Sequence, residues 1–358
     1  MKALTPPEPD EPRRPAGPGT DVRSGGVTIY AVAERAGVSI ATVSRVLRGT
    51  ATVAPETRQR VLDAVDHLRF TPSRLGRSLA ERRHAASGIV FPDLSGPYFA
   101  EVVLGYEEVA AELGRSVLIL ATHGRPAARE MVLDLASRVD GLVVLGRTVD
   151  DGVVSEVVAL GPPVVLMARP PVEGAAAVNA DNTTSAAQLA RHLVEHGYRR
   201  VTFLGDEASS PDTHERWTAL CAALRDAGVR PPTRPARCAF DEGAGHETAQ
   251  RVLARRPLPD AVVCANDEIA LGTLLAGEEA GLSVPGDVAV TGWDDVMAAR
   301  YARPALTTVA QPMRALGERA ARLLHDLIEG GDPSPHHDVL PTRLVIRDSC
   351  GTHPVEER

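Results

Sequence analysis

The 358-residue sequence predicts an α/β core of two parallel-sheet subdomains, preceded by a small all-α unit. Residues 28–69 contain three short stretches with apolar side chains at helical spacing. From residue 87 onward, apolar runs of strand length alternate with helical stretches, which is typical of parallel sheets covered on both faces. About eight to ten such runs are present, too many for one six-stranded sheet, so we expect two subdomains.

The composition is that of a globular protein, with 44% hydrophobic and 24% charged residues. No stretch approaches the ~20 apolar residues that a membrane helix requires. Residues 1–26 are rich in proline and charge and lack the apolar core of a signal peptide, so we expect a disordered tail on a cytoplasmic protein. The four cysteines are scattered without metal-ligand spacing, which favours reduced thiols over a metal site or disulfides. We expect no cofactor.

Charge is distributed unevenly along the chain. The net charge is −8, but residues 27–84 contain ten arginines and five acidic residues, a local charge of +5 that leaves −13 elsewhere. A basic module on an acidic body is expected when one end of a protein meets a phosphate backbone. A solvated charged surface would give the same count, so charge alone leaves both interpretations open.

The N-terminal unit is predicted to be a helix-turn-helix. Its first helix is expected to begin after Thr28 and end at Gly37, and its second helix begins after Ser39. Pro55 opens a third helix, at a position where its missing N–H costs nothing. The third helix is expected to present one apolar face, made by Val61, Leu62, Val65 and Leu68.

The second helix of such a unit lies in the major groove of DNA. Three of its residues are expected to be buried against the first helix: Val43, Val46 and Leu47. Five are expected to be exposed: Ile40, Ala41, Thr42, Ser44 and Arg45. Hydroxyls near a helix N-terminus suit phosphate contact, so DNA contacts are also expected of Thr28 and Ser39. An arginine such as Arg45 can bind guanine through two hydrogen bonds.

Residues 28–80 closely resemble the headpiece of the lactose/galactose repressor family, and they read TIYAVAERAGVSIATVSRVLRGTATVAPETRQRVLDAVDHLRFTPSRLGRSLA. The resemblance continues through almost the whole chain. It implies a homodimer on a palindromic operator, with Ile40, Ala41 and Arg45 at the base-reading positions. Ala31 and Ala54 depart from the family, which usually has polar capping residues there. Each departure could cost about 1 kcal/mol of helix stability.

Within that match, residues 71–80 resemble the family's hinge helix. The resemblance implies that Arg74 and Leu79 contact DNA, with Leu79 wedged into the minor groove and Leu75 facing the partner hinge. Gly76 lowers helix propensity by about 1 kcal/mol, so the segment should fold only on DNA. A plain interdomain linker is the alternative.

The core is predicted from eight apolar runs: SGIVFP, SVLILA, GLVVLG, PVVLMA, AAVNA, RVTFLG, DAVVCA and DVAVTG. Helices are expected at Phe99–Leu113, Thr183–His196 and His214–Ala227. The domains are placed at 1–26 (tail), 27–72 (headpiece), 73–86 (hinge), 87–350 (core) and 351–358 (tail). By the resemblance, the core is periplasmic-binding-protein-like, with a first subdomain at 87–179 and 310–340 and a second at 180–309 and 341–350.

Enzyme signatures are missing from this core. The sequence has no nucleotide-binding glycine motif, no GxSxG and no HExxH. Its one lysine, Lys2, lies in the expected tail, so the predicted folded part has no lysine for Schiff-base chemistry. We therefore expect no enzymatic activity.

Ligands of open α/β sheets bind at the carboxyl ends of the strands. There the resemblance places nine effector-binding residues: Pro92, Ser95, Tyr98, Phe99, Arg216, Phe240, Asn266, Asp294 and Gln311. Carboxylate, amide and guanidinium groups suit a polyol, and aromatic faces suit its ring. Asn266 could instead cap a helix, a role we expect of Asp267, and Asp294 could begin a turn. Ala168 replaces an acid common in the family and Arg169 follows it, which leaves an anionic effector possible.

The sequence thus predicts a DNA-binding transcription regulator, a repressor controlled by a small ligand such as a sugar or sugar derivative. A ligand-corepressed regulator and an extracytoplasmic solute-binding protein are the alternatives. The helix-turn-helix and the lack of a signal peptide count against the latter.

Overall fold

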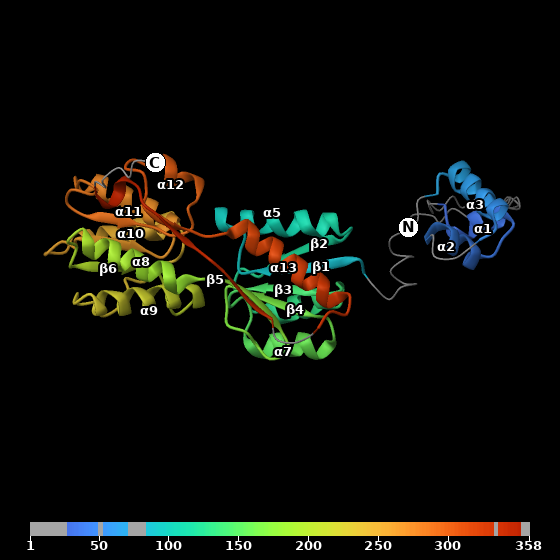
Figure 1. Ribbon diagram of the computed structural model, residues 1–358, viewed down its shortest axis with the longest axis horizontal. Coiled ribbons are helices and arrows are strands. Elements are labelled where there is room, and N and C mark those ends of the chain that lie inside the picture. Colours follow the sequence, from blue (N-terminus) through green and yellow to red (C-terminus); the bar gives the residue numbers. More distant parts are fainter. Residues whose placement is uncertain (1–26, 49–52, 71–83, 333–335, 352–358) are drawn as a thin grey trace, which may run out of the picture. The chain divides into compact units, whose positions relative to one another are not determined.

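The structure, a computed structural model, describes residues 27–48, 53–70, 84–332 and 336–351 (Figure 1). The chain divides into two compact units, residues 1–77 and 78–358, and each is described by itself. Within the described ranges, no helix is long and apolar enough to cross a membrane.

The first unit is a three-helix headpiece composed of α1 (Ile29–Ala36), α2 (Ile40–Arg48) and α3 (Pro55–Leu68). Gly37 ends α1 with φ 64°, a left-handed conformation that glycine adopts without strain. The headpiece has its own apolar core of buried residues: Val32, Ala33, Ala36, Val43, Val46, Val61, Ala64 and Phe70. The expected buried side of α2 is therefore present, with Leu47 half-buried at its edge.

Two details of the headpiece differ from expectation. Thr28 is the N-cap residue of α1, but its side chain makes no capping hydrogen bond. Leu62 is exposed, and Ala64 is buried in the core instead, because only residues three or four positions from Val61 and Leu68 share their face of the helix. The Ser39 hydroxyl does cap α2, since it accepts a hydrogen bond from the Thr42 amide at 3.2 Å.

The second unit contains two lobes. The first lobe is built on a six-stranded parallel sheet in the order β10-β5-β4-β3-β1-β2. Its strands are β1 (Ala86–Phe91), β2 (Ser116–Ala121), β3 (Leu142–Leu145), β4 (Val164–Met167), β5 (Ala176–Ala180) and β10 (His337–Leu340). Its helices are α5 (Pro97–Glu112), α6 (Ala128–Ala136), α7 (Asp151–Leu160) and α13 (Met313–Ile328).

Strand alternation divides the first lobe into two cores, because successive side chains point to opposite faces of a sheet. Ile89 and Val143 pack with α5 and α13, whereas Val90 and Val144 pack with α6 and α7. Helices α5 and α13 approach closely at Gly317, where an added Cβ would lie 2.1 Å from the Val102 carbonyl oxygen.

The second lobe contains a three-stranded parallel sheet in the order β6-β7-β8. Its strands are β6 (Val201–Leu204), β7 (Ala261–Cys264) and β8 (Ala289–Thr291). Its helices are α8 (Asn182–Glu195), α9 (Pro211–Asp226), α10 (Glu242–Leu253), α11 (Asp267–Glu279) and α12 (Met297–Tyr301). A separate antiparallel pair joins β9 (Thr308–Ala310) to β11 (Arg343–Val345), and a short 3-10 helix covers Asp348–Cys350.

The chain passes between the lobes three times. It leaves the first lobe after β5, returns after β9 to form α13 and β10, and crosses again into β11 (Figure 1). All eight apolar runs form strands, and parallel sheets in two lobes confirm the predicted fold class. The antiparallel β9–β11 pair was not predicted, since neither strand exceeds three residues.

Candidate functional site

A pocket of about 430 Å³ lies in the second unit, with walls from both lobes. The first lobe contributes residues that follow β1, β3 and β4, and the second contributes residues that follow β6, β7 and β8. Ligand sites of open α/β sheets form at the carboxyl ends of strands, as here. The volume falls within the range of sites for one small molecule.

The structure brings all nine residues of the predicted effector site to this one pocket: Pro92, Ser95, Tyr98, Phe99, Arg216, Phe240, Asn266, Asp294 and Gln311. Their contact with an effector stays a prediction. The predicted effector site leaves out several charged lining residues, chiefly Asp93, Arg147, Asp212, Asp241 and Glu268. For Asp212 and Glu268 a signal was available, because each lies at the start of a helix that follows a strand of the second lobe.

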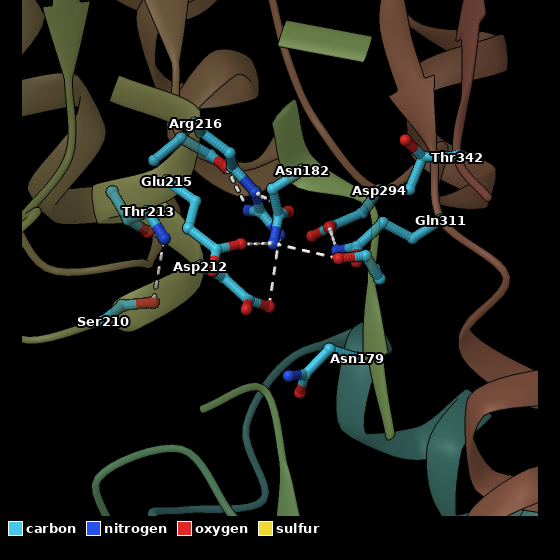
Figure 2. Close-up of polar contacts among 12 residues, drawn as sticks. Asn179, Asn182, Ser210, Asp212, Thr213, Glu215, Arg216, Asp294, Gln311 and Thr342 are labelled. Carbon is cyan, nitrogen blue, oxygen red and sulfur yellow. Dashed lines mark hydrogen bonds and ion pairs between the residues drawn. The ribbon is translucent and has the colours of Figure 1, made fainter. Parts of the chain in front are cut away.

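Arg216 is anchored inside the protein (Figure 2). Its Nε donates to Asn182 Oδ1 at 2.8 Å and its Nη1 donates to the Ala265 carbonyl oxygen at 2.8 Å. The guanidinium lies 4.6 Å from the centre of the Trp293 ring, a cation–π contact. Its Nη2 forms an ion pair with Asp212 Oδ2 at 3.7 Å, so Arg216 cannot offer its full fork of donors to a ligand.

Asn182 holds this arrangement together and was not predicted. Its Oδ1 accepts from Arg216, while its Nδ2 donates to Glu215 Oε2 at 3.0 Å (Figure 2). Asn182 is buried at the first position of α8, a helix whose N-cap is Asp181. A buried amide that serves both a cation and an anion fixes the position of both side chains.

Asp294 is buried with φ 116°, a conformation that residues other than glycine rarely adopt. Hydrogen bonding secures it: its amide donates to the Val309 carbonyl oxygen at 2.8 Å, and Gln311 Nε2 donates to its Oδ1 at 2.6 Å. Burial raises the pKa of Asp294 to about 6; Arg216 and the Gln311 hydrogen bond lower it, while Asp212 raises it further. Asp294 thus presents a constrained, poorly solvated carboxyl group to the pocket.

The helix-capping role expected of Asp267 belongs to Asn266 instead. Asn266 is the N-cap of α11, because its Oδ1 accepts from the Ile269 amide at 3.0 Å. Asp267 is fully buried and joins loops of the second lobe, since it accepts from Thr308 Oγ1 at 2.6 Å and from the Val296 amide at 2.9 Å. Asn266 still lines the pocket, but its side-chain oxygen is already used by the helix.

Arg169 does not face the pocket. Its side chain is buried and its Nη1 donates to the carbonyl oxygens of Gly146, at 3.0 Å, and Val149, at 2.9 Å. Asp151 accepts from its Nη2. The basis for an anionic effector at this strand end is therefore removed, and Ala168 alone lines the cavity there.

The pocket is instead acidic. It is lined by five carboxylates, those of Asp93, Asp212, Asp241, Glu268 and Asp294, against two guanidinium groups, those of Arg147 and Arg216. Burial raises the pKa of Asp212 and raises that of Glu268 to about 7, where neighbouring acids add to the effect. Nowhere in the described ranges do His, Cys, Asp and Glu side chains form a group that could hold a metal ion.

The exposed side of α2 differs in part from expectation. Ile40, Ala41 and Arg45 are exposed, but Thr42 and Ser44 are half-buried. The Thr42 hydroxyl lies 2.9 Å from that of Ser39, and Arg45 Nε donates to the Ala41 carbonyl oxygen at 3.2 Å. Arg74, Leu75 and Leu79 of the expected hinge lie outside the described residues.

A helix-turn-helix unit joined to a two-lobed core with a ligand-sized pocket defines a ligand-regulated DNA-binding protein. Comparison with known proteins agrees. Residues 28–73 match the description "Bacterial regulatory proteins, lacI family" and residues 190–350 match "Periplasmic binding protein-like domain".

Whole-chain relatives give the same assignment. The HTH-type transcriptional repressor PurR of Mannheimia succiniciproducens is 35% identical over 90% of this chain and 98% of its own. The repressor CytR of Escherichia coli is 32% identical over 91% and 97%. The chain belongs to the lacI family of bacterial regulatory proteins, and it is a ligand-regulated DNA-binding repressor.

Solved structures support the same fold. The lac repressor dimer bound to operator and the anti-inducer ONPF is 27% identical, with a TM-score of 0.81 over 92% of this chain and 100% of that one. The complex of the regulator CelR with cellobiose is 32% identical, with a TM-score of 0.70 over 90% and 99%.

Proposed function

We propose that this chain acts as a cytoplasmic homodimer that binds a palindromic operator and is released from it by a small ligand, a sugar or sugar derivative, bound in the two-lobed pocket. The observation that carries the ligand half of the proposal is the convergence of all nine predicted effector residues on one cavity. The DNA half rests on the folded headpiece, whose α2 exposes Ile40, Ala41 and Arg45.

Control by ligand follows from the composition of the pocket walls. Tyr98 and Phe99 belong to the first lobe, and Arg216 and Phe240 to the second, so a ligand that touches all four is sensitive to the relative orientation of the lobes. A ligand shifts such an equilibrium only by its differential affinity for the two states, typically ~1–3 kcal/mol. Release from DNA is the favoured response, and corepression is the alternative.

A dimer is proposed because one helix-turn-helix covers one half-site of a palindrome. Among relatives, the lac repressor has been solved as a dimer on its operator. Static light scattering of the full chain should give twice the chain mass of 37.9 kDa. A stable monomer, or a tetramer at micromolar concentration, would contradict the proposal.

An enzymatic role is not proposed, since the relatives are transcription regulators. The direct test is selection of the full chain on random duplex DNA. We expect the selection to recover a palindrome. We also expect the fluorescence anisotropy of the bound palindrome to fall when a ligand from a sugar panel is added. Recovery of no preferred sequence would refute the proposal.

A further inference from the structure

The inner wall of the pocket contains more buried negative than positive charge. Asp212 and Asp294 are 8% and 4% exposed, and both face the same arginine, Arg216. Arg216 has already committed Nε to Asn182 and Nη1 to the Ala265 carbonyl oxygen. The other lining cation, Arg147, is exposed at the surface. One buried cation therefore serves two buried carboxyl groups.

A buried acceptor without a partner lies beside them. Gln311 is 8% exposed and donates its amide nitrogen to Asp294, which leaves its Oε1 without a hydrogen bond to any described residue. In Figure 2 the Gln311 amide lies beside Asp294. An unpaired buried acceptor is costly, and Gln311 also lines the pocket, so a ligand donor that reaches this oxygen would be favoured.

A third carboxyl group reaches the cavity from α11. Glu268 lies close to Gly96 of the opposite lobe, where an added Cβ would be 2.8 Å from Glu268 Oε1. Its Oε2 accepts a hydrogen bond from Asn266 Nδ2 at 3.2 Å, but none of the described arginines forms an ion pair with it. Closing a ligand into the pocket would remove water from these groups, and an uncompensated charge then becomes more costly.

We propose that the effector is a positively charged ring compound, of which an amino sugar is the simplest kind, with its ammonium group directed at Asp294, Gln311 and Glu268. The inference rests on the proposed ligand control and specifies the chemistry of the same pocket. Tyr98, Phe99 and Phe240 line the cavity and supply apolar faces for the ring. Five carboxyl groups against two guanidinium groups disfavour an anion, and a neutral sugar adds no opposite charge to them.

The test measures ligand affinity of the full chain by calorimetry with matched sugars: glucosamine, N-acetylglucosamine, glucose and glucuronate, and the corresponding galactose series. N-acetylation is the sharpest comparison, since it keeps the nitrogen and removes the charge. An amino sugar should bind at least about tenfold more tightly than its N-acetyl, neutral and acidic counterparts, as expected for charge-assisted hydrogen bonds. Equal or tighter binding of a neutral or acidic sugar, or no binding of any amino sugar, would overturn the inference.

Glu268→Gln separates charge from shape. This substitution keeps the side-chain length at a half-buried position and should reduce the ratio of amino-sugar affinity to neutral-sugar affinity about tenfold. Glu278→Gln is the matched control, because Glu278 is exposed on the same helix and does not line the pocket. An unchanged preference in Glu268→Gln would also overturn the inference. Operator binding measured without ligand on the same samples tests the proposed function separately.

Discussion

At the scale of single residues, Asp294 couples stability to pH. Burial raises its pKa from 3.8 to about 6. Between these two pH values, the folded protein therefore keeps a proton on the Asp294 carboxyl that the unfolded chain has lost. Stability contributed by the protonated group is therefore complete below pH 4 and is lost as pH rises through 6. The loss amounts to at most about 3 kcal/mol, since one pKa unit is worth about 1.4 kcal/mol.

Asp294→Asn should remove this loss, because an amide cannot ionise but still accepts from Gln311. Relative to wild type, the variant should gain about 2 kcal/mol of unfolding free energy between pH 4 and pH 7, measured by urea denaturation. Asp226→Asn, at the exposed end of α9, should gain nothing. A difference between Asp294→Asn and wild type that does not change with pH would show that the Asp294 carboxyl is ionised at both values.

Arg45 acts at the same scale on DNA. Arg45→Ala should weaken operator binding by about 1–3 kcal/mol and relax the base preference at one position of each half-site. Arg58→Ala is the control, because it removes the same charge from an exposed position on α3. The control should lower affinity for all sequences alike, as loss of a phosphate contact does. Competition binding with single-base operator variants distinguishes the two patterns, and an unchanged preference in Arg45→Ala would exclude base reading by this residue.

At the scale of secondary-structure elements, the first lobe depends on the close approach of α5 and α13. Gly317→Ala places a methyl group 2.1 Å from the Val102 carbonyl oxygen, so the helices must separate. The expected cost is about 1–3 kcal/mol of unfolding free energy. Gly277→Ala in α11 is the matched control: its Cβ would meet nothing closer than 3.7 Å, and it should stabilise the helix by about 0.5–1 kcal/mol. Equal effects on the two urea midpoints would contradict the account of this interface.

The elements were predictable where local pattern decides them. Eight apolar runs became eight strands, and the pocket residues converge because strand ends in parallel sheets meet at one edge. The orientation of the Arg169 side chain was not predictable, since it is set by hydrogen bonds to the carbonyl oxygens of Gly146 and Val149, about 20 residues away in sequence. The same holds for Arg216, whose donors are taken by Asn182 and Ala265. These outcomes depend on tertiary contacts between distant segments.

At the scale of the whole molecule, control requires a ligand that touches both lobes. Tyr98→Ala in the first lobe and Phe240→Ala in the second should each abolish the effector response, since either loss removes the ligand's differential affinity. Operator affinity without ligand should stay within about twofold of wild type. Leu160→Ala, exposed on α7, should respond normally. Anisotropy titrations with the identified effector provide the measurement, and a full response in either pocket variant would mean that the ligand contacts one lobe alone.

The order of segments along the chain has a consequence for synthesis. The sheet of the first lobe includes β10, and its helical layer includes α13, both of which follow the entire sheet of the second lobe in sequence. While a ribosome is still translating the second lobe, β5 has no β10 to pair with and the core beneath α13 is open. The headpiece has no such dependence, because its apolar core is complete by Phe70. A nascent or prematurely terminated chain can therefore contain a folded headpiece before the ligand-binding core is complete. Removal of such fragments would matter for the genes this protein regulates, because a fragment of this kind could bind DNA without responding to the ligand.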